Sequence, residues 1–324
     1  MEDQVQKQSQ QKSQTKTLPD SAAAPESFLY LYLLGAMQQS QLTMTVRLAC
    51  IPEEIARLPE IVQAWRRASA RMLQLTREEA GVTDQIVIED TPGGILKRLQ
   101  EIEADPLFLA SFSDLPTSFK IVEIDKLIAP QREVNLDYVS TLRSRIKSKR
   151  VEDLVEFCVG PRREPPPLKV LQTAYNQMTY TSRSLDLRFL GGFPKPIGED
   201  DIRVAHTGGQ PVEAVTLLIG FGAAPINAWM VGKRLVLANG FHRIVALRMQ
   251  GVTQIPIVIR HVANPEIEFP EQYIGLSRQY LLQNPRPVLV KDFFDRELTL
   301  ELRLKPRSKT LKVAWGPEDA LIPE

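Results

Sequence analysis

The sequence predicts an α+β fold: a small mixed sheet with helices, preceded by an N-terminal helical region and followed by a C-terminal β-hairpin extension. Three observations predict it. Apolar residues recur at helical spacing over 53–80, a strand–turn–helix pattern covers 234–250, and apolar residues alternate with polar ones over 297–315. Helical spacing indicates an amphipathic helix and alternation indicates a half-buried strand, so both kinds of element are expected.

The composition is that of a soluble globular protein. The 324 residues are 43% hydrophobic and 24% charged, which suits one large domain or two. The 40 basic and 39 acidic residues nearly cancel, so DNA is a disfavoured partner. Cys50 and Cys158 stand far apart, which excludes a CxxC metal pair and predicts two reduced, buried thiols in a cytoplasmic protein.

The N-terminal part divides into a tail, 1–25, and a helical region, 26–115. The tail is rich in glutamine and has too few apolar residues to offset the entropy of ordering, so we expect it to be disordered. The apolar run 28–34 is far shorter than the roughly 20 residues that span a bilayer. It predicts a buried helix or strand, and no membrane partner is expected.

Two helices are expected in the region 26–115. The first covers 53–80, with a break near Pro59, because proline lacks the N–H that a helix interior needs. The second covers 95–103 and is expected to end at Asp105-Pro106.

Residues 116–262 are expected to form the main α/β domain. Its predicted elements are a strand at 120–124, a helix at 136–146, strands at 225–230 and 234–238, a helix at 241–250 and a strand at 255–259. Pro256 places the last strand near a sheet edge, since proline cannot donate to a ladder.

Two further segments differ from the rest of the chain in composition and in hydrophobic pattern. Residues 147–212 contain three consecutive prolines and two Gly-Gly pairs, so we expect an irregular insertion with a function of its own. Residues 263–324 are expected to form a helix followed by an amphipathic hairpin, in which Leu298–Leu304 pairs with Leu311–Trp315 across a turn at Pro306.

The turn Asn-Gly-Phe-His-Arg at 239–243 joins the strand at 234–238 to the next helix. The first N–H groups of a helix lack backbone partners and carry partial positive charge, so they favour phosphate. Gly240 permits a positive φ, and His242 and Arg243 add side-chain donors. The pattern predicts a phosphate-binding turn. The structural alternative is that His242 braces a strand end.

The segments around this turn resemble the ParB/sulfiredoxin superfamily. A strand and loop, Val122–Glu133, precede a helix that begins at Leu136, and a strand with Pro225-Ile226 follows. The turn then has the Gly-x-His-Arg form, and a proline-containing strand at 255–259 closes the unit. The resemblance covers both sides of the insertion and indicates no subfamily.

The resemblance implies binding of a nucleotide with Mg²⁺, CTP in ParB-like members and ATP in sulfiredoxin and related serine kinases. His242 and Arg243 correspond to the phosphate-binding pair of the superfamily. The implied nucleotide-binding residues lie on the turn and on the loop that faces it: Asn239, Gly240, Phe241, His242, Arg243, Gln131 and Arg132.

Three departures limit the resemblance. Sulfiredoxin chemistry needs a nucleophilic cysteine where this chain has Phe241, so that activity is excluded. Asn239 replaces an acidic residue and cannot act as a base. No helix-turn-helix is recognisable after Ile259, which makes ordinary chromosome partitioning an unfavoured function.

Whether the protein is an enzyme stays open. An NTPase or phosphotransferase needs a carboxylate for metal or proton transfer, and Glu133 is the first candidate and Asp125 the second. Each has the alternative of a solvated loop acid. His206 and His261 lack ligand-spaced partners, so no metal site formed by protein side chains alone is expected.

Two basic clusters, 143–150 and 303–312, are each open to two interpretations. The cluster at 143–150 is either a patch that binds nucleic acid or an acidic partner, or a solvated helix end. The cluster at 303–312 is either a hairpin that binds a phosphate backbone or a protected strand edge.

The first hypothesis for function is a nucleotide-binding protein, with a switch coupled to a protein partner or self-association through 26–115 or 263–324. The alternatives are a non-catalytic interaction or DNA-associated scaffold, and a small-molecule phosphotransferase using Glu133.

Overall fold

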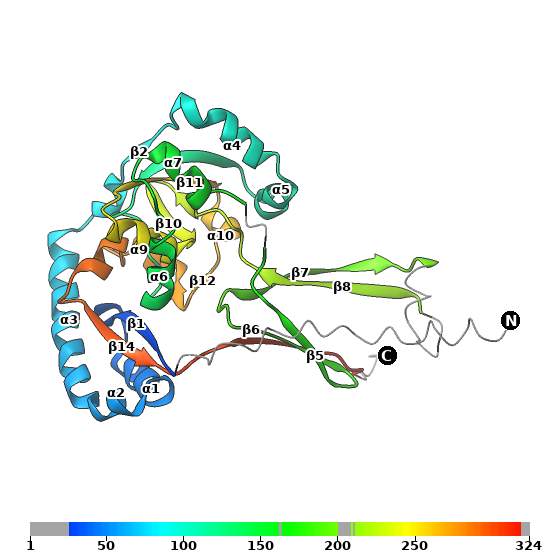
Figure 1. Ribbon diagram of the computed structural model, residues 1–324, viewed down its shortest axis with the longest axis horizontal. Coiled ribbons are helices and arrows are strands. Elements are labelled where there is room, and N and C mark those ends of the chain that lie inside the picture. Colours follow the sequence, from blue (N-terminus) through cyan, green and yellow to red (C-terminus); the bar gives the residue numbers. More distant parts are fainter. Residues whose placement is uncertain (1–25, 162–163, 200–208, 210, 319–324) are drawn as a thin grey trace, which may run out of the picture. The chain divides into compact units, whose positions relative to one another are not determined.

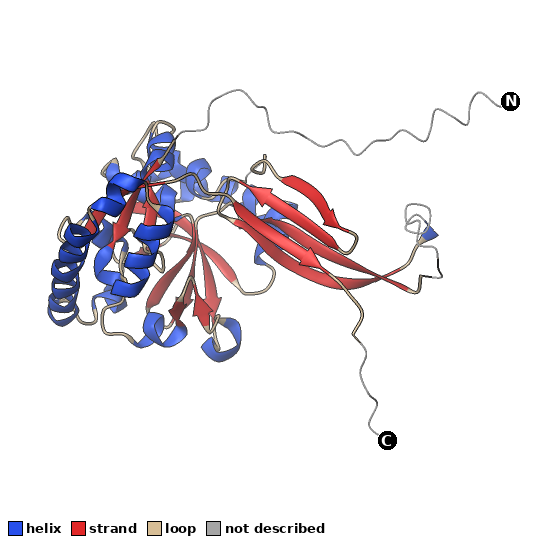
Figure 2. Cartoon of the chain, turned by 90° about the horizontal axis from the view of Figure 1, so that it is seen from below, coloured by secondary structure: helices blue, strands red, loops and turns tan. Residues whose placement is uncertain are grey.

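A computed structural model describes residues 26–161, 164–199, 209 and 211–318, and it is an α+β structure (Figures 1 and 2). The chain forms two compact units. Among the described residues, the main unit comprises 26–161 and 223–306. Among the described residues, the ribbon unit comprises 164–199, 209, 211–222 and 307–318. The predicted tail, 1–25, and His206 lie outside the described residues.

A five-stranded mixed sheet forms the centre of the main unit, in the order β10-β9-β11-β3-β2. β9 and β11 are parallel and every other neighbouring pair is antiparallel. The strands are β2 (Ile88–Glu89), β3 (Thr117–Glu123), β9 (Asn227–Val231), β10 (Arg234–Asn239) and β11 (Gln254–Val262). The apolar run at 255–259 is fully buried, as expected for a strand covered on both faces.

The predicted edge position of the strand at 255–259 is wrong. β11 is the central strand of the sheet, with β9 on one side and β3 on the other. β9 begins to pair with β11 only at Val258, which lies opposite Asn227. Pro256 therefore lies beyond that ladder, and its missing N–H interrupts no hydrogen bond to β9.

Helices of the main unit pack onto this sheet around one apolar core. They are α4 (Leu96–Glu103), α5 (Pro106–Phe112), α6 (Leu136–Arg143), α7 (Val151–Cys158) and α9 (Phe241–Met249). Ile244, Val245 and Leu247 of α9 are fully buried in that core. Asp105-Pro106 ends α4 as predicted but also begins α5, because the Asp105 side chain accepts from the N–H of Leu107.

A second sheet, in the order β14-β1-β4, packs against the N-terminal helices. Its strands are β1 (Phe28–Leu33), β4 (Glu133–Asn135) and β14 (Thr299–Leu304), and the helices are α1 (Gln39–Ala49), α2 (Pro52–Ala56) and α3 (Leu58–Glu78). The apolar run at 28–34 is thus mainly a strand. The predicted break near Pro59 is confirmed, since α2 ends at Ala56 and α3 restarts with proline in its first turn.

The predicted C-terminal hairpin is wrong. Both alternating runs are strands, but they do not pair with each other. β14 pairs with β1 in the main unit, whereas β15 (Lys309–Ala314) pairs with β6 (Gln177–Ser182) in the ribbon unit. Alternation determines which side chains share a face, but it does not determine the partner strand. The second basic cluster is accordingly divided between the two units.

The predicted irregular insertion at 147–212 is wrong over most of its described length. Residues 151–158 form α7 in the main unit, and the ribbon unit contains β5 (Lys169–Ala174), β6, β7 (Leu187–Pro196) and β8 (Glu213–Phe221). β5, β6 and β15 form one sheet, and β7 pairs with β8 alone. Prolines are tolerated here because the three consecutive ones precede β5, and Pro194 and Pro196 lie on β7, an edge strand.

The segment after β11 consists of short elements. They are α10 (Pro265–Glu268), β12 (Gln272–Tyr273), β13 (Leu276–Ser277), α11 (Arg278–Gln283) and a 3₁₀ turn, η4 (Val290–Phe294). Arg143 ends α6, so the first basic cluster does not continue along one helix face as its spacing suggested. In the parts of the chain that the structure describes, no helix is long and apolar enough to cross a membrane.

Candidate functional site

The turn between β10 and α9 takes the backbone conformation that the sequence predicted. Gly240 has φ +97° and directly precedes α9. A Cβ at this position would lie 2.6 Å from Cγ1 of Ile226. Only glycine fits, because a side chain would meet both the unfavourable φ and the isoleucine. The close packing also explains this glycine without any ligand.

The first turn of α9 has no side-chain cap. The first N–H groups of a helix have no acceptor within the helix, so the N-terminus of α9 is in general a favourable position for an anion. The Phe241 ring does not contribute, because it is buried and packs against Phe293 at 4.8 Å between ring centroids. The backbone of Phe241 is therefore part of the turn, and its side chain is part of the core.

Arg243 is directed away from the turn. Its Nη1 donates to the carbonyl oxygens of Phe157 at 3.0 Å and Cys158 at 3.1 Å, and its Nη2 donates to the carbonyl oxygen of Ala224. The first two carbonyls belong to the last residues of α7, where a cation is favourable, and the Cys158 carbonyl also accepts the N–H of Ile226 at 2.7 Å. The guanidinium predicted to bind phosphate thus closes the end of α7.

His242 links the turn to the facing loop. Its Nε2 accepts the backbone N–H of Asn135 at 3.2 Å, and its ring meets the edge of the Tyr138 ring at 5.4 Å. An imidazole nitrogen that accepts a hydrogen bond carries no proton, so the proton of the neutral ring lies on Nδ1. The brace between His242 and a strand end, which was the structural alternative, is therefore present.

The facing loop is positioned by a short stretch of chain that extends the sheet. Ile128 exchanges backbone hydrogen bonds with Leu235 and Leu237 of β10, at 2.9 Å each. On its other side, the N–H of Ala129 donates to Val288 at 2.9 Å. The loop residues 130–133 leave this stretch directly beside the end of β10, where the turn begins.

Gln131 of this loop lines the recess at the candidate site, and Arg132 is the next residue along the chain. A recess of about 10 Å³ is lined by Gln131, Asn239 and Phe241, among others. Arg132 donates from Nη1 to Gln41 at 2.7 Å and from Nη2 to the carbonyl oxygen of Gly275 at 3.3 Å. The Arg132 Nε and the Gln131 Oε1 are buried and have no hydrogen-bond partner among the described residues, and buried polar atoms normally have one.

The two predicted catalytic acids do not lie together. Glu133 opens β4, opposite Tyr32, two residues before the contact between Asn135 and His242. Asp125 forms a bidentate pair with Arg248, at 2.7 and 3.0 Å. Arg248 lies in the last turn of α9, so Asp125 occupies the opposite end of that helix from the turn.

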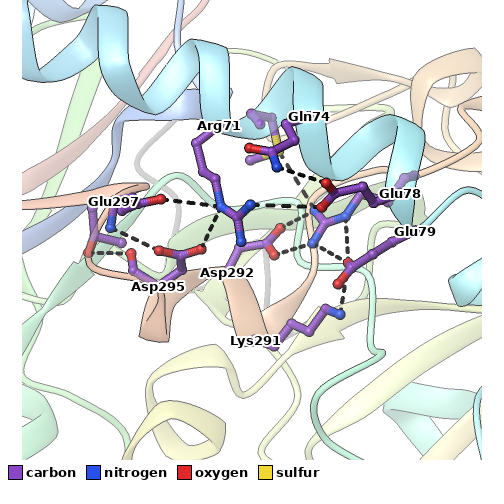
Figure 3. A network of polar contacts seen from close by, with 11 residues as sticks. Arg71, Gln74, Glu78, Glu79, Lys291, Asp292, Asp295 and Glu297 are labelled. Atoms are coloured by element: carbon purple, nitrogen blue, oxygen red, sulfur yellow. Dashed lines mark hydrogen bonds and ion pairs between the residues drawn. The ribbon is translucent and has the colours of Figure 1, made fainter.

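A buried charge network, which the sequence did not indicate, holds the chain that flanks the loop. Arg286 is 1% exposed and Asp292 2% exposed. The Arg286 guanidinium binds both carboxylate oxygens of Asp292 at 2.6 and 2.7 Å, and donates to Glu79 at 2.9 and 3.0 Å. Lys291 also contacts Glu79, at 2.8 Å, and Figure 3 shows this contact beside Asp292.

This network ties the end of α3 to residues 286–292, and Val288 and Val290 of that segment bond to the 127–129 stretch. It therefore acts on the candidate site only by positioning the loop. The sequence gives only a weak signal for this network. An arginine between two prolines, with Lys-Asp further on at 291–292, also suits an exposed loop. Arg286, Asp292 and Glu79 were all missed for that reason.

The two cysteines are buried, as predicted. Burial raises the pKa of the Cys158 thiol to about 12, and the nearby Arg243 lowers it only partly. Such a thiol is protonated at neutral pH and is not a nucleophile. Across the described residues, no group of three or more histidines, cysteines or acids is placed to hold a metal ion.

Comparison of the chain with protein-family models, with curated proteins and with solved structures gives no match. The superfamily resemblance therefore rests on the residues and segment order of this chain alone.

Proposed function

We propose that the main unit binds the phosphate of a nucleotide, ATP or CTP with Mg²⁺, at the turn 239–242. One observation carries the proposal. Two segments more than 100 residues apart in the sequence, residues 130–131 and residues 237–241, line one recess beside the N-terminus of α9. Gln131 lines this recess, and its buried Oε1 has no hydrogen-bond partner among the described residues, which supports binding of a polar group there.

The proposal assigns the cationic role to Arg132 instead of Arg243. Arg243 is held by three carbonyl oxygens, and moving it would remove these three hydrogen bonds, although the Cys158 carbonyl would keep the N–H of Ile226. Arg132 gives only one hydrogen bond to a side chain and one, at 3.3 Å, to a backbone carbonyl. Its planar guanidinium matches phosphate oxygens two at a time. The backbone N–H groups of α9 would bind the same phosphate from the other side.

The test is thermal unfolding of the full chain with ATP, CTP or GTP and Mg²⁺. A nucleotide at one hundred times its Kd stabilises by about 2.7 kcal/mol, which for a unit of this size raises Tm by about 5–11 °C. Arg132→Gln is expected to weaken binding roughly 10- to 150-fold, through the loss of charge-assisted hydrogen bonds. Arg98→Gln, which alters an ion-paired arginine on α4, serves as the matched control.

Two outcomes would contradict the proposal. One is that no nucleotide raises Tm at millimolar concentration. The other is that Arg132→Gln binds as tightly as the control variant. Arg243→Ala is unsuitable as a test, because the loss of its three carbonyl contacts would destabilise the fold whether or not a nucleotide binds.

The ribbon unit supports a second function, a non-catalytic interaction. The β7–β8 pair exposes apolar side chains on both of its faces, and in the described part of the chain neither strand pairs with another. Phe193 and Leu218, for example, are each 47% exposed. A two-stranded ribbon of this kind is marginal alone in water, and open edges pair with other strands. A second copy of the chain presents the same edges and faces, so we infer self-association.

Light scattering after size-exclusion chromatography tests this second function. Self-association predicts about twice the chain mass of 36.6 kDa. Phe193→Lys is expected to restore the single-chain mass. Tyr175→Lys, which changes a 92% exposed aromatic residue outside β7 and β8, should leave the dimer intact. A single-chain mass for the unaltered protein at all concentrations would contradict the inference.

A further inference from the structure

The β12–β13 hairpin covers the recess at the candidate site. Its two-residue turn is Ile274-Gly275, and Ile274 lines the recess together with Asn239 and Phe241. The remaining volume, about 10 Å³, is close to the least that holds one water molecule. A phosphate group cannot enter while the hairpin stays in this position. The site is therefore closed in this conformation.

The hairpin is held mainly by side-chain contacts to the rest of the main unit. Its own ladder has only two residue pairs, too few for an independently stable hairpin. The Tyr273 hydroxyl donates to the carbonyl oxygen of Ala238, and the Tyr273 ring meets the Trp229 ring edge-on at 4.8 Å. Arg132 donates to the carbonyl oxygen of Gly275. Tyr273 and Leu276 also pack against the apolar cluster around Trp229 and Leu281. The position of the hairpin thus depends on these side-chain contacts more than on its own two-pair ladder.

The closed turn is strained at its tip. Ile274 has φ +50°, and among the described residues it is the sole non-glycine with positive φ. Positive φ is a true outlier for a β-branched residue, and strain of this kind gathers at ligand clamps and switches. Its side chain is 49% exposed, so burial does little to hold it there. With Gly275 at φ +72°, the turn has positive φ at both positions, for which Asn-Gly is preferred.

We propose that the β12–β13 hairpin is a lid on the phosphate site, an inference that rests on the function proposed above. Opening relieves the strain at Ile274 and uncovers the turn 239–242. It also releases the Arg132 guanidinium from the carbonyl oxygen of Gly275. Arg132 then exchanges that carbonyl for the phosphate, so the same side chain holds the lid closed and binds the ligand.

Two substitutions shift the lid in opposite directions without altering the residues assigned to phosphate binding. Tyr273→Phe removes the hydrogen bond to Ala238 and favours the open lid. Ile274→Asn creates the preferred Asn-Gly turn and favours the closed lid. Because a closed majority state reduces the apparent affinity by the open fraction, Tyr273→Phe should tighten nucleotide binding and Ile274→Asn should weaken it. Each change is expected to be about two- to tenfold in Kd.

The experiment measures two quantities on the full chain and on both variants. Isothermal titration with ATP and with CTP, each with Mg²⁺, gives Kd. Hydrogen exchange of residues 268–283 without nucleotide gives the opening of the hairpin, which is expected to be faster in Tyr273→Phe and slower in Ile274→Asn.

The outcomes separate the lid from the site. Opposite shifts in Kd that follow the exchange rates support the lid. Binding with equal Kd in all three proteins overturns the lid and leaves the proposed function intact, and so does binding combined with unchanged exchange rates. If none of the three proteins binds nucleotide, including the open-lid variant, the proposed function fails and the lid's role fails with it.

Discussion

Replacing Arg286 with methionine is expected to destabilise the main unit by about 3–5 kcal/mol. Glu79 would keep its contact with Lys291 at 2.8 Å. Asp292, only 2% exposed, would keep the N–H of Leu289 at 2.9 Å but lose both bonds from the guanidinium. Removing one partner of a buried ion pair leaves a charge without compensation, and this is the source of the expected loss.

Urea unfolding followed by tryptophan fluorescence measures the effect. The chain has three tryptophans, of which Trp65 and Trp229 lie in the main unit and Trp315 in the ribbon unit. In a Trp315→Phe background the signal reports the main unit alone, and the midpoint and slope give the free energy of unfolding. The matching decrease in Tm is about 6–20 °C for a unit of this size.

The double variant Arg286→Met, Asp292→Asn provides the control. The asparagine can still accept the N–H of Leu289 but carries no charge, so this variant should recover roughly 1–3 kcal/mol relative to Arg286→Met. A loss below about 1 kcal/mol for the single variant would refute the reasoning. So would a double variant as unstable as the single one.

Gly240→Ala should destabilise the main unit by about 2–6 kcal/mol, since its Cβ would meet both a positive φ and a neighbouring isoleucine. Gly232→Ala, with positive φ and open space, should cost only about 1–2 kcal/mol, and equal losses in urea unfolding would contradict the steric part. Partial burial raises the pKa of Glu79, but hydrogen bonds from Lys291 and Arg286 outweigh it and hold the pKa below the ordinary 4.5. Glu79 therefore stabilises the fold above pH 4.5, and this contribution is lost as pH falls through the lowered pKa. Unfolding free energies of the unaltered protein and Glu79→Gln should converge in acid, and a constant difference from pH 7 to pH 3 would contradict the assignment.

Local structure could be read from the sequence where one periodicity dominated. The α3 helix, its break near Pro59 and the strand–turn–helix around Gly240 follow from spacing and from proline and glycine chemistry. Partners could not be read in the same way. The alternating run at 299–304 pairs with β1, and nothing in its own residues distinguishes that strand from any other apolar edge.

At the candidate site, too, local backbone geometry could be predicted from the sequence and side-chain partners could not. The sequence indicated the backbone geometry at Gly240, because a turn residue depends on its immediate neighbours. The side-chain direction of Arg243 depends on the end of α7, more than 80 residues earlier in the chain, so its contact with Phe157 was not predictable. Arg286 was missed for a related reason, since its burial depends on Glu79, 207 residues away.

Because a chain is synthesised from its N-terminus, both units depend for their folding on strands that are made last. β14 pairs with β1, and β15 pairs with β6 in the sheet that also contains β5. Each unit therefore needs residues beyond position 298 to complete one of its sheets. Pairings between such distant segments form slowly and leave strand edges exposed in the meantime. A chain interrupted shortly before Thr299 would therefore carry two incomplete sheets at once, and we expect it to be recognised by chaperones and proteases as a single unfinished product.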